Sequence, residues 1–418
     1  MEEPHTAPAA LPRIIIANQI SNSLRTRGCH THDCLPMLPL IACLLATQVP
    51  VGQPPRLRTS LSNGAIVQVE RMPNANSLSV QLFVASRNTP ETPATNGRRH
   101  LLEHLVARGT HGDLDQRLES VGAFLNAHTL RDATQFEVTL PAGQLKLGLA
   151  ALQETMHMPE VTQDVIKHEA IVLGQESALR EPEDKLSAAA WSAAYGDDGL
   201  DAFGNLDVIR STTPADLVEL HRRMYIGSNL VISIAGDVDL DAATKLAADI
   251  LKVIPAGETR LPSSRKSATS AEVTLPGSGE ARGAAVPGFL SPKSAWVLAA
   301  GLSVAATIPN CFVTYTPTSR NGLVIVGQTD GNRIGSAFDS AKANELVAHG
   351  RRLARRWVER QLQDPTAVAS LRGMLLVQSL GLKPEVMLEN IDAMQPYQFE
   401  EGLDAFRHGA GVIVGGTR

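Results

Sequence analysis

The chain of 418 residues has few cysteines, no excess of basic residues and no uninterrupted apolar run long enough to cross a membrane. Three of its four cysteines lie in the first 43 residues, so only Cys311 remains beyond them and no internal disulfide is expected there. The formal net charge of -5 provides no general positive field, which argues against nucleic acid as a partner. A hydrophobic content of 43% at this length predicts a globular protein with two or three domains.

The first 55 residues differ from the rest and have the features of a leader. Residues 35–51 are apolar but contain three prolines, which makes this run too short and too broken for a spanning helix. It suits the hydrophobic region of a secretory signal, with Arg25 and Arg27 before it. We therefore expect an exported protein, periplasmic or extracellular, without a transmembrane helix. The four residues ending at Cys43 also resemble a lipoprotein box, but the apolar residues that follow make a lipid anchor at Cys43 the weaker alternative.

Residues 100–104 read His-Leu-Leu-Glu-His and predict a metal site. On a helix, His100 and His104 lie one turn apart on the same face, so both imidazoles can reach one ion, and Glu103 lies beside them. A catalytic zinc ion usually has three protein ligands, and Glu176 is the candidate for the third one. The alternative is that these are ordinary polar residues on an amphipathic helix.

The order of the motif, with the acid just before the second histidine, is inverted relative to His-Glu-x-x-His enzymes. Together with several other stretches, this motif makes residues 61–239 resemble the pitrilysin/insulinase family of zinc metallopeptidases, which includes mitochondrial processing peptidase and insulin-degrading enzyme. The stretches that carry the resemblance follow one another in the family order: residues 61–64, 96–97, 109–110, 122–129, 169–176 and 229–238.

The resemblance implies a role for each polar residue of the motif. His100, His104 and Glu176 would bind one zinc ion per chain, Glu103 would be the catalytic general base, and Glu169 would be a second acid behind the ligands. Glu169 and Glu176 are two helical turns apart and so lie on one side of their helix. From there Glu169 could orient a zinc-binding histidine through its other ring nitrogen. A solvated surface carboxylate is the alternative for Glu169.

A candidate substrate-binding strand follows the motif. Residues 126–129 and the alternating run 134–140 are typical of β-strands. The resemblance implies that the strand with Asn126 and Ala127 is an exposed edge, to which a peptide substrate adds as a further strand beside the scissile bond. Such pairing derives its affinity from backbone hydrogen bonds. The alternative is an interior strand in which Asn126 only caps a turn.

We expect an α+β protein with two homologous pitrilysin-like α/β sandwich domains, each an antiparallel sheet covered by helices. A catalytic domain at residues 56–254 would follow the leader at 1–55, and Pro, Gly and Ser residues mark a linker at 255–270. Residues 271–418 would form a non-catalytic second domain, shortened and divergent. A helix predicted at 336–361 carries a basic cluster, read as a solvated face or as the lining of a chamber: Arg351, Arg352, Arg355, Arg356 and Arg360.

The expected function is that of a zinc metalloendopeptidase acting on small or unfolded peptides. Glu103 would accept a proton from a zinc-activated water and pass it to the leaving amine. The alternative is a non-catalytic peptide-binding or scaffolding subunit of a heterodimeric peptidase, which the intact motif disfavours. Family members supply an Arg and a Tyr from the second domain to bind substrate carbonyls, but residues 296–304 contain neither. We therefore expect a homodimer or a heterodimer with another family subunit.

Overall fold

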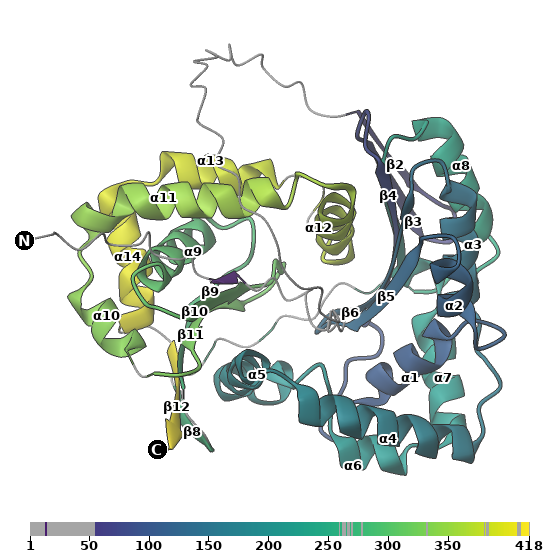
Figure 1. Cartoon of the computed structure of the whole chain (residues 1–418), viewed down its shortest axis with the longest axis horizontal. Coiled ribbons are helices and arrows are strands. Elements are labelled where there is room, and N and C mark those ends of the chain that lie inside the picture. The colour runs from purple at the N-terminus through teal and green to yellow at the C-terminus, as the bar shows by residue number, and fades with distance from the viewer. Residues whose placement is uncertain are drawn as a thin grey trace, which may run out of the picture.

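Two mixed sheets, each covered by helices, make up the fold in the computed structural model (Figure 1). The structure describes residues 13–14, 55–258, 260, 265, 268, 271–276, 279–331, 333–379, 381, 384–407 and 411–417. Most of the leader-like segment, including Cys43, lies outside these residues. Within that segment, β1 (Arg13–Ile14) pairs with a strand of the second sheet.

The first sheet lies in the N-terminal half and has the strand order β2-β3-β7-β4-β6-β5. β3 and β7 run parallel, whereas every other neighbouring pair is antiparallel. The edge strand β5 has no partner on its outer side among the described residues. The strand bounds are β2 (Arg56–Ser60), β3 (Ile66–Arg71), β4 (Ser77–Ala85), β5 (Phe124–Thr129), β6 (Ala133–Pro141) and β7 (Leu230–Gly236).

One face of this sheet is covered by helices of the same half. Side chains alternate along β4, so that Leu78, Val80 and Leu82 join the main core of this half, whereas Gln81 and Phe83 point to the other face. The helices of this half are α1 (Arg98–Ala107), α2 (Leu114–Glu119), α3 (Leu145–Thr155), α4 (Gln163–Leu179), α6 (Leu206–Ser211), α7 (Pro214–Met224) and α8 (Leu240–Leu251).

The second sheet repeats the topology of the first. Its order is β1-β10-β11-β9-β12-β8, with the parallel pair β12 and β8 in the place of β7 and β3. β1 adds a second parallel pair, with β10, at the other edge. This repeat confirms the expectation of two similar domains. The elements are β8 (Ala271–Pro276), β9 (Glu280–Val286), α9 (Pro292–Ala305), β10 (Cys311–Tyr315), β11 (Gly322–Gln328), α10 (Ile334–Ser340), α11 (Ala343–Arg360), α13 (Glu385–Ala393), α14 (Pro396–Arg407) and β12 (Gly411–Thr417).

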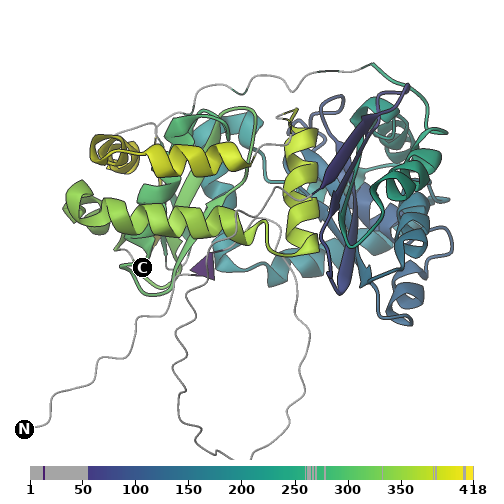
Figure 2. The ribbon, with the colours of Figure 1, turned by 90° about the horizontal axis from the view of Figure 1, so that it is seen from above.

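Each half lends one helix to the sheet of the other half (Figures 1 and 2). α12 (Pro365–Val377) packs on β4 and β7 of the first sheet, and α5 (Pro182–Tyr195) packs on β9 and β11 of the second. A Cβ atom at Gly373 would come within 2.0 Å of the Phe83 ring, so only glycine allows α12 this close to β4. Arg372 of α12 forms a buried ion pair with Glu70 of β3 at 2.8 Å. The two halves are therefore held together by interlocked helices.

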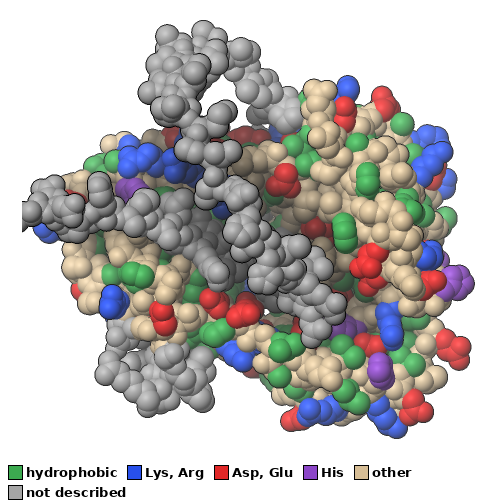
Figure 3. All heavy atoms as spheres, in the orientation of Figure 1, with side chains coloured by type: hydrophobic (Ala, Val, Ile, Leu, Met, Phe, Trp, Pro, Cys, Tyr) green, Lys and Arg blue, Asp and Glu red, His purple; other side chains and the backbone are tan. Residues whose placement is uncertain are grey.

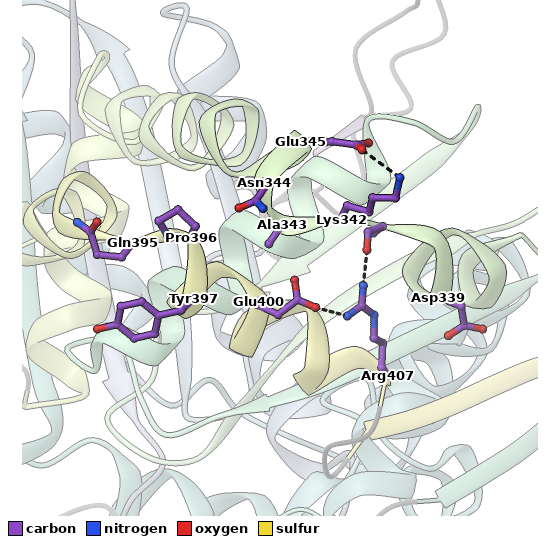
Figure 4. Close-up of a pocket in the computed structure, with 11 residues that line it drawn as sticks. Asp339, Lys342, Ala343, Asn344, Glu345, Gln395, Pro396, Tyr397, Glu400 and Arg407 are labelled. Atoms are coloured by element: carbon purple, nitrogen blue, oxygen red, sulfur yellow. Dashed lines mark hydrogen bonds and ion pairs between the residues drawn. The ribbon is translucent and has the colours of Figure 1, made fainter.

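The helix expected at residues 336–361 is two helices, and this prediction was wrong. Residues 341 and 342 are extended, and the chain turns between α10 and α11. The Arg407 guanidinium donates hydrogen bonds to the carbonyl oxygens of Phe338 and Ala341, at 2.8 and 2.5 Å, and so satisfies the end of α10. An open groove of about 1080 Å³ lies beside this junction, with Arg407 and Glu400 ion-paired in its wall (Figure 4).

The basic cluster of α11 matches the solvated-face alternative. Arg352, Arg355 and Arg356 are exposed, while Leu353 and Trp357 on the opposite side are buried. On the face of the molecule shown in Figure 3, acidic and basic side chains are interspersed. None of the described helices is both long enough and apolar enough to cross a membrane.

Candidate metal centre

The helix that carries the motif starts in a tightly specified turn. Gly97 at the N-terminus of α1 has a left-handed backbone with φ of 106°, and an added Cβ atom would approach the Ile209 side chain to 2.8 Å. The Glu91 carboxylate accepts hydrogen bonds from the backbone N–H groups of Gly97 and Arg99, at 2.9 and 3.2 Å. A carboxylate at this end also interacts favourably with the helix dipole. These contacts fix the direction in which α1 presents its histidines.

Three predicted ligands meet between α1 and α4. Glu176 Oε2 lies 3.4 Å from His104 Nε2 and 3.8 Å from His100 Nε2. One donor atom from each of the three residues lies within 4.8 Å of the other two. Two imidazole nitrogens and one carboxylate oxygen form a donor set that zinc accepts, with a fourth position left for water or substrate. The residues therefore fit a catalytic zinc ion.

The other ring nitrogen of each histidine is held by a hydrogen bond. His100 Nδ1 lies 2.9 Å from the carbonyl oxygen of Phe203, which can only accept, so Nδ1 carries the proton and Nε2 is left as a ligand. His104 Nδ1 lies 3.4 Å from Glu169 Oε2, and Arg108 holds the other oxygen of that carboxylate at 2.6 Å. Glu169 is 4% exposed, and the solvated-carboxylate alternative was wrong.

The electrostatic surroundings of His104 favour a positive charge. Burial lowers the pKa of His104, but hydrogen bonds to Glu169 and Glu176 and the charge of Glu103 outweigh burial and raise the pKa to about 10. The hydrogen bond to His104 is also the main reason why the pKa of Glu169 is lowered. A divalent cation would supply this positive charge in place of the proton.

Glu103 lies beside the three ligands and is itself held in place. Its Oε2 atom is 3.9 Å from His100 Nε2, and the carboxylate is 6% exposed. The Thr129 hydroxyl, at the end of β5, donates a hydrogen bond to the same oxygen at 3.0 Å. Thr129 was not among the predicted site residues, although it lies within a stretch that resembles the family. The strand that would bind substrate thus also contacts the candidate base.

The loop that carries Phe203 is tied to the start of α1. Asn96 donates from its side chain to the carbonyl oxygen of Asp201 at 2.9 Å, and its own carbonyl oxygen accepts from the N–H of Asn205 at 3.1 Å. Arg180, just after α4, forms an ion pair with Asp201 at 2.6 Å. Phe203 itself had no recognisable signal in the sequence, because its contribution is a backbone carbonyl and a ring packed 4.8 Å from His100.

Asn126 and Ala127 lie on β5, an edge strand, so the interior-strand alternative for Asn126 was wrong. Both residues are half-buried. Asn126 is paired in register with Glu137 of β6, and the two side chains are hydrogen-bonded. Burial, opposed by this bond, raises the pKa of Glu137 to about 7. The edge therefore presents backbone groups close to the metal centre.

Known sequences match the chain in both halves. The sequence profile of the insulinase (peptidase M16) family matches residues 66–200, and that of the peptidase M16 inactive domain matches residues 211–308. An uncharacterised zinc protease of Mycobacterium leprae is 29% identical over 197 residues, 45% of this chain and 44% of that protein. The mitochondrial-processing peptidase subunit beta of Saccharomyces cerevisiae is 29% identical over 225 residues, 50% of this chain and 48% of that protein. The matches span about half the length of these relatives.

Solved structures agree with this assignment at the level of the fold. A protease from Helicobacter pylori superimposes with a TM-score of 0.75 at 18% identity, over 88% of this chain and 100% of that one. An M16-like peptidase from Alicyclobacillus acidocaldarius gives 0.70 at 15% identity, over 88% and 99%. With a repeated pitrilysin-like topology and two profile matches in the family order, the chain belongs to the insulinase (peptidase M16) family of peptidases.

Proposed function

We propose that the chain is a zinc-dependent metalloendopeptidase that hydrolyses small or unfolded peptides. The observation that carries the proposal is the convergence of His100, His104 and Glu176 on one point, with Glu103 beside them. When bound there, zinc supplies the Lewis acidity that polarises a peptide carbonyl and lowers the pKa of water. Relatives named zinc proteases support the choice of metal.

The protein's own groups would handle the proton and the substrate. Glu103, fixed by Thr129, accepts a proton from the attacking water and returns it to the leaving amine. A peptide adds to the outer edge of β5, so backbone hydrogen bonds orient it while Asn126 and Ala127 lie beside it. Glu169 and the Phe203 carbonyl keep the histidine rings in the orientation that zinc requires.

The Glu103→Gln variant tests this proposal. Glutamine keeps the shape but cannot accept the proton, so we expect zinc content to be unchanged and cleavage of a quenched fluorescent peptide to fall at least about a thousand-fold. Loss of zinc from Glu103→Gln would show that the roles of the residues are misassigned. Equal cleavage by the variant and the wild type would exclude Glu103 as the base.

The second candidate function is that of a non-catalytic subunit, and the observation that favours it concerns the C-terminal half. Residues 296–304, which lack the expected Arg and Tyr, lie in α9 and are almost entirely buried. We propose that a second subunit of the family, identical or different, completes the substrate site. Peptidase activity should then be weak in a dilute monomer and rise with dimerisation, measured by light scattering alongside the peptide assay. Full activity in the pure monomer would contradict the need for a partner.

We also propose that residues 1–55 direct export. Removal of this segment should keep the protein inside the producing cell, as measured by cell fractionation and intact mass. Retention of the full segment in the mature protein would contradict the proposal.

A further inference from the structure

A polar cavity of about 110 Å³ lies between the two halves of the chain, away from the three candidate zinc ligands, none of which lines it. Its walls come from the end of β4, the start of α1, the β5–β6 turn, the region after α5, residue 265, the β10–β11 turn and the end of α12. The cavity is notable for five guanidinium groups, contributed by Arg87, Arg99, Arg131, Arg265 and Arg320.

Two half-buried carboxylates pair with three of these arginines. Asp132, in the β5–β6 turn, lies between Arg320 and Arg265, the latter at 3.5 Å, and also accepts a hydrogen bond from Gln378 at 2.9 Å. Burial would raise the pKa of Asp132, but the two arginine charges outweigh it and lower the pKa. Glu91 pairs with Arg99 at 3.2 Å.

Arg87 and Arg131 lack such a direct ion pair, although the charges of Asp201 and Asp132 act on Arg131 from a greater distance. Neither forms an ion pair with any described residue, and both are half-buried at the cavity wall. Arg131 donates to the carbonyl oxygens of Gly199 and Leu200 and lies 4.3 Å above the Trp191 ring. These contacts stabilise a cation less than a carboxylate does.

The other charged residues of the cavity lining also leave an excess of positive charge inside the cavity. The remaining acidic residues, Asp197 and Asp198, are exposed at the rim, where water screens them. Burial lowers the pKa of Arg131 to about 10, with the charge of Arg265 acting in the same direction against that of Asp201. Burial likewise lowers the pKa of Arg87. An anion in the cavity would relieve both effects.

We propose that this cavity is an anion-binding site that takes a small oxyanion, phosphate or carboxylate, between Arg87 and Arg131. The planar guanidinium fork matches two oxygens of either group, and the partly closed wall strengthens such hydrogen bonds. The site is independent of the zinc ligands and of the proposed peptidase activity.

Binding of inorganic phosphate to the full chain, followed by calorimetric titration and ³¹P NMR at constant ionic strength, tests the proposal. The variants are Arg87→Gln and Arg131→Gln, and the matched control is Arg210→Gln, an exposed arginine outside the cavity. We expect the wild type and the control to bind equally and both cavity variants to bind at least about ten-fold more weakly. If phosphate binds at the candidate metal centre instead, the Arg87→Gln substitution should leave its affinity unchanged.

Citrate and acetate form the second arm and identify the source of the oxyanion. Displacement of phosphate by these carboxylates supports a site for either group, and failure to displace it supports a phosphate site. Phosphate should also raise the thermal unfolding midpoint of the wild type but not of Arg87→Gln. If Arg131→Gln does not fold, Arg87→Gln decides alone. No phosphate binding by the wild type, or equal binding by Arg87→Gln and the wild type, would overturn the proposal.

Discussion

The two halves of the molecule share one strand topology, yet among the described residues only the N-terminal half brings together a set of candidate metal ligands. In the N-terminal half, α1 follows β4 and presents His100, Glu103 and His104 towards α4. In the C-terminal half, α9 follows β9 in the equivalent place, carries no histidine or acid, and is buried beneath α11 and α14. The comparison teaches that the fold supplies a position for a site, while a few polar side chains supply the chemistry.

The largest effect should come from removing a ligand in α1. His104→Ala should lose both zinc and peptidase activity, because two protein ligands hold a catalytic zinc much less firmly than three. Metal content by mass spectrometry and the peptide assay would measure this. His111→Ala, an exposed histidine just after α1, is the control and should behave as wild type. Wild-type zinc content in His104→Ala would show that His104 does not bind the zinc ion.

The second-largest effect should come from breaking the buried ion pair that links the two halves. Arg372→Met leaves Glu70 as an unpaired buried carboxylate and should destabilise the protein by about 3–5 kcal/mol in denaturant unfolding. The exposed pair of Arg71 and Asp237 is the control, and Arg71→Ala should cost much less than Arg372→Met because water screens the pair. Equal costs for the two variants would show that the halves do not depend on this ion pair.

In the full chain, the open edge of β5 contrasts with β10, whose corresponding edge is paired with β1 of the leader-like segment. A peptide substrate methylated on the backbone nitrogens that face β5 should bind at least about ten-fold more weakly, because it loses backbone hydrogen bonds. Methylation of the alternate nitrogens should have little effect. Inhibition constants against an unmodified peptide would measure both, and an equal response to the two methylation patterns would argue against strand addition.

A smaller effect is expected at Thr129. Thr129→Val removes the hydroxyl that orients Glu103 and should lower kcat about ten-fold with little change in KM, because a hydrogen bond to a charged group is lost. Thr129→Ser keeps the hydroxyl and should restore most of the rate. If serine and valine variants are equally slow, packing rather than the hydrogen bond is responsible.

The smallest effect should be the pH dependence that Glu137 imposes. Its folded-state pKa of about 7 lies above the usual value, so the protonated form favours folding and this contribution is lost as pH rises towards and through 7. Glu137→Gln should therefore gain stability relative to wild type as pH rises from 5 to 8, measured by urea unfolding. The groups around Glu137 are Gln81, Asn126 and, more distantly, Asp364. A constant difference across this range would contradict the assignment.

The convergence of the candidate metal ligands could be predicted in part from the sequence, because residue spacing on a helix fixes the direction of the side chains. His100 and His104 are one turn apart, and helical periodicity was enough to predict that both lie on one face of α1. The distance between α1 and α4 could not be derived in this way, so the role of Glu176 depended on family resemblance. Contacts through backbone carbonyls, such as that of Phe203, leave no pattern in the sequence.

Long-range packing also could not be predicted from the sequence. The exchange of α5 and α12 between the sheets depends on shape, as in the contact of Gly373 with Phe83, rather than on local propensity. The break between α10 and α11 depends on Arg407, more than 60 residues away along the chain. Single charged residues that make such long-range contacts follow no repeating pattern, so their contacts could not be predicted from the sequence.

Anomalous diffraction at the zinc edge, from crystals of the full chain grown with zinc, would show directly whether His100, His104 and Glu176 bind the metal. We predict one strong peak per chain, from a zinc ion bound by these three residues in the N-terminal half, and none near α9. A zinc ion bound elsewhere, or no ion between these three side chains, would contradict this prediction.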